Sequence, residues 1–283
     1  MPRRAPLLRS NRSRDHRGNA RDVCLVDRMM SHPSNFSSAS TAFPVLGSSD
    51  VHVWFCDLLH YAADQEVLAA LLSGDERVRA ARFAFDRDRQ RFILSHALLR
   101  LLLSRYTRMH ARQIRFATGP HGKPAISGAG AASQPIQFSL SHSGPIALVA
   151  VARGLAVGVD VEVRKADVDA LKLAQRFFAP RESQLITAAE GDDRARMFYR
   201  LWAAKEAYLK GKGVGLSLGL DRFDVVFDGM SPVATVRWTD SGTIDQPWTI
   251  RSLSLPDHLA GAVAVEGDAW ELHHYESTAY SFY

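Results

Sequence analysis

The sequence predicts a mixed α/β protein, a pseudo-dimer of two similar α/β halves with its site in the cleft between them. One observation is that strands and helices follow in the same order in two successive stretches of the chain. The other is recurrence at a fixed offset. Ser139-Leu140-Ser141 and Gly154 return 113 residues later as Ser252-Leu253-Ser254 and Gly267, and ALVAVARG at 147–154 is similar to GAVAVEG at 261–267. Because matched order and matched offset seldom coincide by chance, we expect an internal duplication.

The first half begins with a strand at 51–58, where VHVWFCDL has the pattern of a half-buried strand. A short helix at 65–72 is stopped by Ser73-Gly74, and a longer, basic amphipathic helix runs from Asp86 to about Tyr106. This half is completed by a short segment at 114–117, a turn at 119–124, a Gly/Ala/Ser loop at 127–133 and two strands at 136–140 and 146–152.

The second half repeats this order. A strand at 157–163 (VGVDVEV) precedes a helix at 167–178, which Pro180 ends, and a longer helix at 193–210, which Asp192 or Asp193 caps and Gly211 and Gly213 stop. Strands near 223–227 and 248–253 follow, and the last expected strand is 260–266. The two long helices align at an offset of 110, which pairs Phe92 with Trp202 and Arg100 with Lys210.

Composition is that of an ordinary soluble globular protein, since 46% of the 283 residues are apolar and 23% are charged. No apolar run approaches the ~18 residues of a membrane span, so we expect no membrane-embedded protein. Two cysteines, Cys24 and Cys56, form neither a disulfide framework nor a C-x-x-C site, which favours a reducing, cytoplasmic setting.

The net charge of +5 lies entirely in the first 48 residues, which hold eight arginines, no lysine and three aspartates. The rest is neutral overall, so charge does not predict a nucleic-acid partner. We expect a disordered Arg-rich extension at 1–48, an N-terminal half at 49–154 and a C-terminal half at 155–283. The extension lacks the apolar core of a secretory signal, whereas a mitochondrial presequence and a true start at Met29 or Met30 stay open.

Three carboxylates and a lysine form the strongest candidate site. Asp160 and Glu162 are two residues apart on a predicted strand, so both side chains point to one face of the sheet. Glu206 and Lys210 are one helical turn apart. Converging carboxylates supply the hard oxygen ligands that Mg²⁺ prefers. A solvated strand face and an ordinary helix ion pair are the alternatives that these residues leave open.

Two loops suggest phosphate binding. The turn at 119–124 joins two glycines to Lys123, which is typical of a phosphate cradle and equally of a plain hairpin. The motif Ser141-His142-Ser143 lies at a strand end, where His142 can donate to a phosphate. A Ser/His nucleophile pair is disfavoured, because neighbouring strand residues point in opposite directions and neither serine lies in a G-x-S-x-G elbow. The glycines at 211–215 follow a helix, so we interpret them as a helix stop.

Four motifs in order carry a specific resemblance: G-K-P at 122–124, F-S-L-S-H-S at 138–143, G-V-D-V-E at 158–162 and L-W-A-A-K-E-A-Y-L-K-G-K-G-V-G-L at 201–216. Together they resemble the 4′-phosphopantetheinyl transferases of the larger, surfactin-synthetase-activating type. The resemblance implies a two-half monomer with the active site in its cleft, unlike the smaller, trimeric holo-acyl-carrier-protein synthase type. It also implies transfer of the 4′-phosphopantetheine arm of coenzyme A to a serine hydroxyl of an apo carrier protein, with release of 3′,5′-ADP.

The resemblance also implies residue roles. Asp160, Glu162 and Glu206 would hold Mg²⁺, or Mn²⁺ in its place, on the coenzyme A pyrophosphate. Glu206, or a water that it holds, would be the base for the carrier serine, and Lys210, with Lys205 as its neighbour in the motif, would stabilise or protonate the leaving phosphate. The positions that would bind coenzyme A are Arg79, Arg91, Lys123, Pro124, Ser141, His142, Asp160, Glu206 and Lys210. Glu76 stands where some relatives carry a basic residue, so the 3′-phosphate clamp departs from the family pattern.

The expected partners are apo acyl or peptidyl carrier proteins, with no nucleic acid and no membrane. The residues do not distinguish carriers of fatty acid, polyketide or nonribosomal peptide synthesis. Two alternatives stay open: a different Mg²⁺-dependent nucleotide enzyme that uses the same carboxylates, and a non-catalytic protein of the same fold that binds a carrier protein or a nucleotide.

Overall fold

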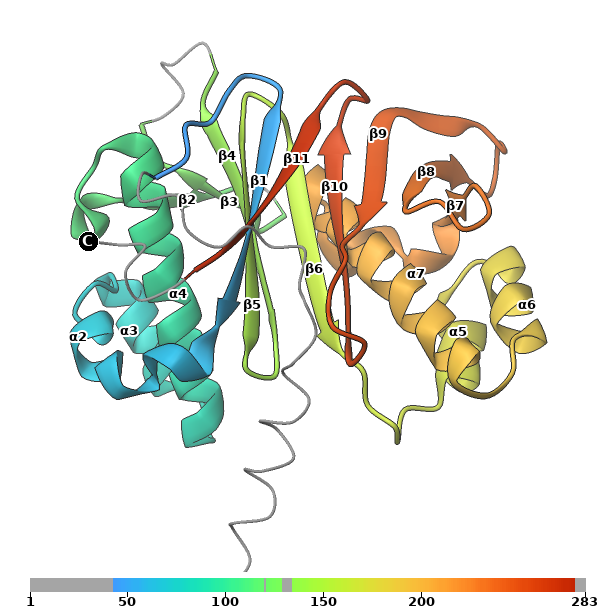
Figure 1. Cartoon of the computed structure of the whole chain (residues 1–283), viewed down its shortest axis with the longest axis horizontal. Helices are drawn as coiled ribbons and strands as arrows, with labels where there is room; N and C mark the ends of the chain where they lie inside the picture. Colours follow the sequence, from blue (N-terminus) through green and yellow to red (C-terminus); the bar gives the residue numbers. More distant parts are fainter. Residues whose placement is uncertain (1–42, 120, 129–133, 278–283) are drawn as a thin grey trace, which may run out of the picture. The chain divides into compact units, whose positions relative to one another are not determined.

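Two β-sheets lie face to face, and one long helix packs on the outer face of each (Figure 1). This arrangement comes from a computed structural model, which describes residues 43–119, 121–128 and 134–277. All of the described residues belong to one compact unit. The first sheet has the strand order β11-β1-β5-β4 and the second has the order β6-β10-β9-β8-β7. The predicted mixed α/β, two-half architecture is therefore confirmed.

The first half runs from β1 to β5. Its strands are β1 (Asp50–Asp57), β2 (Phe116–Thr118), β3 (Pro124–Ile126), β4 (Ile136–Ser143) and β5 (Ile146–Arg153). Its helices are η1 (Leu58–Asp64), α2 (Gln65–Ala69), α3 (Gly74–Ala81), α4 (Asp86–Thr107) and η2 (Ala111–Gln113). Helix α4 buries Phe92, Leu99 and Leu103, three of the apolar residues whose spacing predicts it, in the first core.

The second half runs from β6 to β10, and a final strand follows it. The strands are β6 (Val157–Val163), β7 (Phe223–Phe227), β8 (Val233–Trp238), β9 (Ile244–Ser252), β10 (Leu259–Glu266) and β11 (Glu271–Glu276). The helices are α5 (Ala170–Phe177), α6 (Pro180–Ala188), α7 (Gly191–Lys212), η4 (Gly215–Leu218) and η5 (Leu220–Arg222). Between the sheets, the inner faces of β1 and β5 bury valine, leucine and alanine side chains against those of β6 and β10.

A buried ion pair recurs in both halves. In the first, the guanidinium of Arg100 on α4 bonds Glu76 and donates to the carbonyls of Ala111 and Ile114. In the second, the ammonium of Lys205 on α7 bonds Glu182 and donates to the carbonyls of Leu220 and Phe223. Each glutamate also accepts from the N-cap amide of a short helix: Glu76 from Ser73 of α3 at 2.7 Å and Glu182 from Ala179 of α6 at 3.3 Å. Equivalent contacts from equivalent elements support the predicted duplication.

The offset predicted for the strands is confirmed at β5 and β10, whose limits differ by 113 residues. The offset of 110 predicted for the long helices is wrong: α4 and α7 both have 22 residues and begin 105 residues apart, at Asp86 and Gly191. Arg100 therefore corresponds to Lys205, not to Lys210. The strand order β1-β5-β4, antiparallel throughout, corresponds to β6-β10-β9.

Several elements differ from the prediction. Helices α3 and α6 begin at Gly74 and Pro180, which we had interpreted as helix stops. Strands β8 and β11 were not predicted, and β11 pairs in parallel with β1, so the chain returns from the second half to the first sheet. The N-cap of α7 is Glu190 rather than either predicted aspartate, and Gly211 lies inside that helix, whereas Gly213 ends it with φ of 69°.

The predicted N-terminal extension is described only in its last residues. Leu46 is buried in the first core, and Phe43 stacks on Trp54 with 5.3 Å between ring centres. Residues 1–42, where we expect disorder, lie outside the described residues. We retain the division of the rest into two halves at 154 and 155 as a proposal. Within the described ranges, no helix is both long and apolar enough to cross a membrane.

Candidate active site between the two halves

The halves meet along a seam between β4 and β6, where serine hydroxyls take the place of a partner strand. The serines alternate along β4, so their side chains share one face. Their hydroxyl oxygens accept hydrogen bonds from β6 amides: Ser139 from Val159 at 3.1 Å, Ser141 from Val161 at 3.4 Å and Ser143 from Val163 at 3.1 Å. The S-x-S-x-S spacing therefore satisfies an edge of β6 that would otherwise have unpaired amides.

The same serines hold the two carboxylates of β6. Ser141 donates to Oδ1 of Asp160 at 2.8 Å, and Ser143 donates to Oε2 of Glu162 at 2.8 Å. Both carboxylates therefore lie on the seam side of β6, as their spacing predicts. The alternative of a solvated strand face does not hold for Asp160, which is only 3% exposed.

Helix α7 packs closely on β6 because glycines lie at the contact. A Cβ atom on Gly158 would lie 2.0 Å from the carbonyl oxygen of Ala207 and 2.2 Å from the amide nitrogen of Gly211. Any side chain at residue 158 would push the helix away from the strand. The glycine of G-V-D-V-E therefore lets α7 bring Glu206 and Lys210, one helical turn apart, next to the carboxylates of β6.

Lys210 joins the two halves. Its ammonium donates to Oδ1 of Asp160 at 2.6 Å and to Oγ of Ser141 at 2.8 Å. Its side chain stays one-third exposed, at 33%. The ion pair that Lys210 forms is therefore with Asp160 on β6, across the contact between strand and helix, rather than with Glu206 on its own helix.

The three carboxylates interact unfavourably with one another. Burial raises the pKa of Asp160, and the charge of Lys210 opposes this shift without cancelling it. Burial and then the charge of Asp160 raise the pKa of Glu162. Burial, again followed by Asp160, raises the pKa of Glu206 to about 7. The cluster thus carries more negative charge than one lysine neutralises, which is an environment that a bound cation would relieve.

The donor set fits a divalent cation. All three side chains offer carboxylate oxygens, and Oδ2 of Asp160 is buried without a hydrogen-bond partner in the described part of the chain. The set is not closed, however. In the described part of the chain, the ligand oxygens of the three carboxylates do not all lie within 4.8 Å of one another. The glutamate side chains would have to rotate to complete the site.

A cavity of about 730 Å³ opens beside Lys210, lined by residues of both halves. This volume is within the usual range of small-molecule sites, ~300 to 1,000 Å³. Of the positions predicted to bind coenzyme A, six line it: Arg79, Lys123, Pro124, Ser141, His142 and Lys210. Arg91 and the three carboxylates lie outside its described lining.

Basic groups gather around His142. Burial lowers the pKa of His142, and the charges of Lys210, Arg91 and Arg79 lower it further. Arg91 therefore acts on the site electrostatically although it does not line the cavity. Its guanidinium also lies 3.4 Å from Asp88, and that of Arg79 lies 5.1 Å from the ring centre of Phe92. Such a set of cations is suited to phosphate groups.

Lys123 is engaged with the backbone. The predicted turn is a hairpin between β2 and β3, and the Lys123 ammonium donates to the carbonyls of Gly211 at 2.5 Å and Val157 at 3.2 Å. Burial lowers its pKa to about 8. Lys123 therefore links the hairpin to the end of α7 and to β6, and direct contact with a phosphate stays a prediction.

Lys205 does not reach the site. Its side chain is fully buried on the far side of α7, where its ammonium lies 2.7 Å from Glu182. It links α7 to α6 and β7, so the suggested role beside Lys210 is wrong.

Three further side chains that line the cavity, His96, Arg100 and Arg115, were not among the predicted site residues. The sequence signal that singles out Arg100 is its place in the duplication, where it corresponds to Lys205 of the second half. Glu76, singled out as a departure from the family, accepts hydrogen bonds from the amide of Ser73 at 2.7 Å and from Arg100 at 2.8 Å, so it is part of the scaffold of this wall.

Comparisons with known proteins place the chain among its relatives. Residues 156–264 match the family model of the 4′-phosphopantetheinyl transferase superfamily, and residues 61–153 match one described as 4′-phosphopantetheinyl transferase, N-terminal. The 4′-phosphopantetheinyl transferase HetI of Nostoc sp. is 34% identical over 224 residues, which cover 79% of this chain and 91% of HetI. The 4′-phosphopantetheinyl transferase Sfp of Bacillus subtilis is 34% identical over 162 residues, 57% of this chain and 69% of Sfp.

The putative 4′-phosphopantetheinyl transferase slr0495 of Synechocystis sp. is 40% identical over 153 residues, which cover 54% of this chain and 61% of that relative. The two family models match one half each. Because a relative is also matched over 91% of its length at 34% identity, this chain belongs to the 4′-phosphopantetheinyl transferase superfamily.

Proposed function

We propose that this chain transfers the 4′-phosphopantetheine arm of coenzyme A to a serine hydroxyl of an apo acyl or peptidyl carrier protein, releasing 3′,5′-ADP. The observation that carries the proposal is the junction of Lys210, Asp160 and Ser141 at the wall of a cavity lined by both halves. The family uses coenzyme A as a substrate and acts on carrier proteins, which supplies the two reactants.

The nucleotide end of coenzyme A has phosphates that suit the basic end of the cavity. Arg79 and His142 line that end, and Arg91 adds charge from beside it. We assign the 3′-phosphate to these groups, because charge-assisted hydrogen bonds to phosphate are the strong ones. Lys123 and Pro124, where the turn meets β3, also line the cavity and would contact coenzyme A.

Asp160, Glu162 and Glu206 would hold Mg²⁺, and Mn²⁺ has the same preference for oxygen ligands. When bound, Mg²⁺ would supply positive charge to the pyrophosphate that is attacked and broken. The buried, unpartnered oxygen of Asp160 and the raised pKa values of Glu162 and Glu206 support this assignment.

The remaining chemistry is proton transfer. The carrier serine oxygen forms a bond to the phosphorus that carries the pantetheine arm, and the bond from that phosphorus to the bridging oxygen of 3′,5′-ADP breaks. Glu206, directly or through a water that it holds, would take the serine proton as general base. Lys210 is placed to stabilise or protonate the departing phosphate oxygen.

The partner is proposed from electrostatics and from the family. Carrier proteins present an acidic helix beside the modified serine, and a chain that is neutral overall outside its first 48 residues can still present a local basic patch that attracts this helix. The whole chain would act as a monomer, because its two halves together complete one cleft. We propose that it acts in the cytoplasm. No described feature calls for nucleic acid.

Intact-mass spectrometry tests the proposal. An apo carrier protein is incubated with the full chain, coenzyme A and Mg²⁺, beside an EDTA control, and we expect a mass gain of one phosphopantetheine arm that EDTA abolishes. Asp160→Asn and Glu206→Gln should abolish the gain, whereas Asp193→Asn, an exposed carboxylate at the start of the same helix, should leave it unchanged.

Each outcome has a distinct meaning. No gain on acyl or peptidyl carriers, from protein shown to be folded by circular dichroism, would favour a non-catalytic binding protein of this fold. A gain that persists in EDTA would overturn the metal assignment but not the reaction. Near-normal transfer by Asp160→Asn would remove the cluster from the mechanism.

A further inference from the structure

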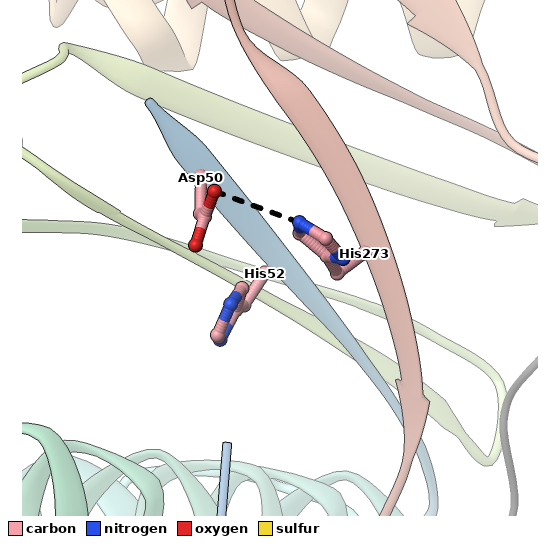
Figure 2. A group of neighbouring side chains, drawn as sticks. All are labelled: Asp50, His52 and His273. Atoms are coloured by element: carbon pink, nitrogen blue, oxygen red, sulfur yellow. Dashed lines mark ion pairs between the residues drawn. The ribbon is translucent and has the colours of Figure 1, made fainter. Parts of the chain in front are cut away.

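A second cluster of metal-ligand side chains lies outside the cavity, on the first sheet. Strands β1 and β11 pair in parallel, with His52 opposite His273 and Asp50 opposite Glu271. Alternation along a strand puts Asp50 and His52 on one face of β1, next to His273 on β11. Figure 2 shows Asp50 and His273 facing each other across the two strands, with His52 beside Asp50. None of them lines the cavity between the halves.

The spacing of the three groups matches a metal site better than it matches hydrogen bonds. One ligand atom of each residue lies within 4.8 Å of the other two. Oδ1 of Asp50 is 3.6 Å from Nε2 of His273, which is too long for a hydrogen bond. Bonds of ~2.1 Å at a tetrahedral ion hold their ligand atoms ~3.4 Å apart. Nε2 of His273 is buried and has no hydrogen-bond partner among the described residues.

Neighbouring groups orient two of the three side chains. The amide of Gly47 donates to Oδ2 of Asp50 at 2.8 Å, which leaves Oδ1 toward His273. Nδ1 of His52 lies 2.8 Å from the hydroxyl of Tyr106, whose oxygen also accepts from Nε1 of Trp54 at 2.7 Å. Metal ligands are typically supported in this way, the second ring nitrogen of a histidine being held by a polar partner.

We propose that Asp50, His52 and His273 bind one divalent transition-metal ion, with Zn²⁺ preferred. Two imidazoles and one carboxylate suit Zn²⁺, whereas Mg²⁺ prefers an all-oxygen set such as that of the cleft. His52 would bind through Nε2 while Nδ1–H donates to Tyr106. Glu271, whose Oε1 lies 4.0 Å from Nε2 of His273, is placed to supply a fourth ligand.

The ion would join two strands that are far apart in sequence. Asp50 and His52 begin the first half, whereas His273 lies on the strand that returns from the second half. His273 and Asp50 keep side-chain exposures of 32% and 23%, so an ion can reach the site from solvent. Its role would be structural, fixing the returning strand to the first sheet.

The test is a titration of the full chain with Zn²⁺ alone, after removal of metals with EDTA and with Mg²⁺ present to fill the carboxylate site. We expect one Zn²⁺ per chain by calorimetry. At a hundredfold excess over the dissociation constant, we expect a melting temperature raised by roughly 5 to 10 °C. His273→Gln and Asp50→Asn, both partly exposed, should each weaken binding at least ~tenfold.

The control is His274→Gln, which removes an imidazole from the same strand but from its other face. It should bind Zn²⁺ as the natural chain does. His52→Gln is less informative because His52 is buried and its loss could unfold the protein. Absence of Zn²⁺ binding, or equal binding by the natural chain, His273→Gln and Asp50→Asn, would overturn the proposal.

Discussion

Replacing Glu206 by glutamine removes the group proposed as the catalytic base, yet it is expected to make the metal-free protein more stable above pH 7. In the folded chain the pKa of Glu206 is about 7, against an ordinary value of 4.5, because the side chain is partly buried and lies near Asp160. The folded state therefore binds the Glu206 proton more tightly than the unfolded state does. Ionising Glu206 costs stability.

The magnitude follows from these two pKa values. They differ by about 2.5. At ~1.4 kcal/mol per pKa unit, ionising Glu206 lowers the free energy of unfolding by at most ~3.4 kcal/mol. Solvent screening of a partly exposed side chain reduces this to ~1 to 2 kcal/mol. The sign follows from linkage: the cost is absent below pH 4.5, where Glu206 is protonated in both states, grows between pH 4.5 and 7, and is complete above pH 7.

Urea unfolding followed by tryptophan fluorescence, in EDTA at pH 5 and pH 8, measures this difference. The free energy of unfolding of Glu206→Gln should exceed that of the natural chain by ~1 to 2 kcal/mol at pH 8 and by much less at pH 5. Added Mg²⁺ should stabilise the natural chain and close the gap at pH 8, because it binds the folded state. Asp193→Asn should instead lower the free energy of unfolding slightly, because it removes a favourable negative charge from the first turn of the same helix. A variant that is no more stable than the natural chain at pH 8 would refute the reasoning.

Three further predictions concern the scaffold. Lys205→Met should lower the free energy of unfolding by ~3 to 5 kcal/mol, because Glu182 stays buried without its cation, and adding Glu182→Gln should recover part of this loss in a urea titration. Gly158→Ala should lower the free energy of unfolding by ~1 to 3 kcal/mol or more, because its Cβ would lie 2.0 Å from a carbonyl oxygen of α7. It should also lower transfer activity. Calorimetry measures the first effect and the mass assay the second. Removing residues 1–42 should leave the melting temperature unchanged, whereas also removing 43–48 should lower it, because Leu46 is buried.

Elements with a strong local pattern could be predicted from the sequence. The strand at 157–163 has the limits of β6, and the long helix at 86–106 ends one residue short of α4, because apolar spacing is read from neighbouring residues. Helices α3 and α6 were missed because Gly74 and Pro180 were interpreted as ends. Both residues stand at the first helical position, where proline is favoured, and Ser73 and Glu76 form the capping box that marks a start.

Long-range features were harder to foresee. Strand β11 has the sequence ELHHYE, whose apolar alternation is weak because it lies at the edge of the first sheet, and its partner β1 is more than 200 residues away. The spacing of Asp160 and Glu162 predicted that they share a face, but their serine partners come from another strand. Lys205 and Lys210, five residues apart, lie ~140° apart around a helix, so helical geometry alone indicated that both could not face the cleft.

The seam makes site geometry and sheet contact depend on the same atoms. Ser141 satisfies an amide of β6, donates to Asp160 and accepts from Lys210, so a change in the charge of the cluster acts directly on the contact between the halves. The buried ion pairs of Arg100 and Lys205 hold each long helix to its own half. Each half can therefore stay folded while the cleft between them carries uncompensated negative charge. Binding of a divalent cation would then tighten the seam, because the cation relieves the repulsion between carboxylates at the point where the two sheets meet.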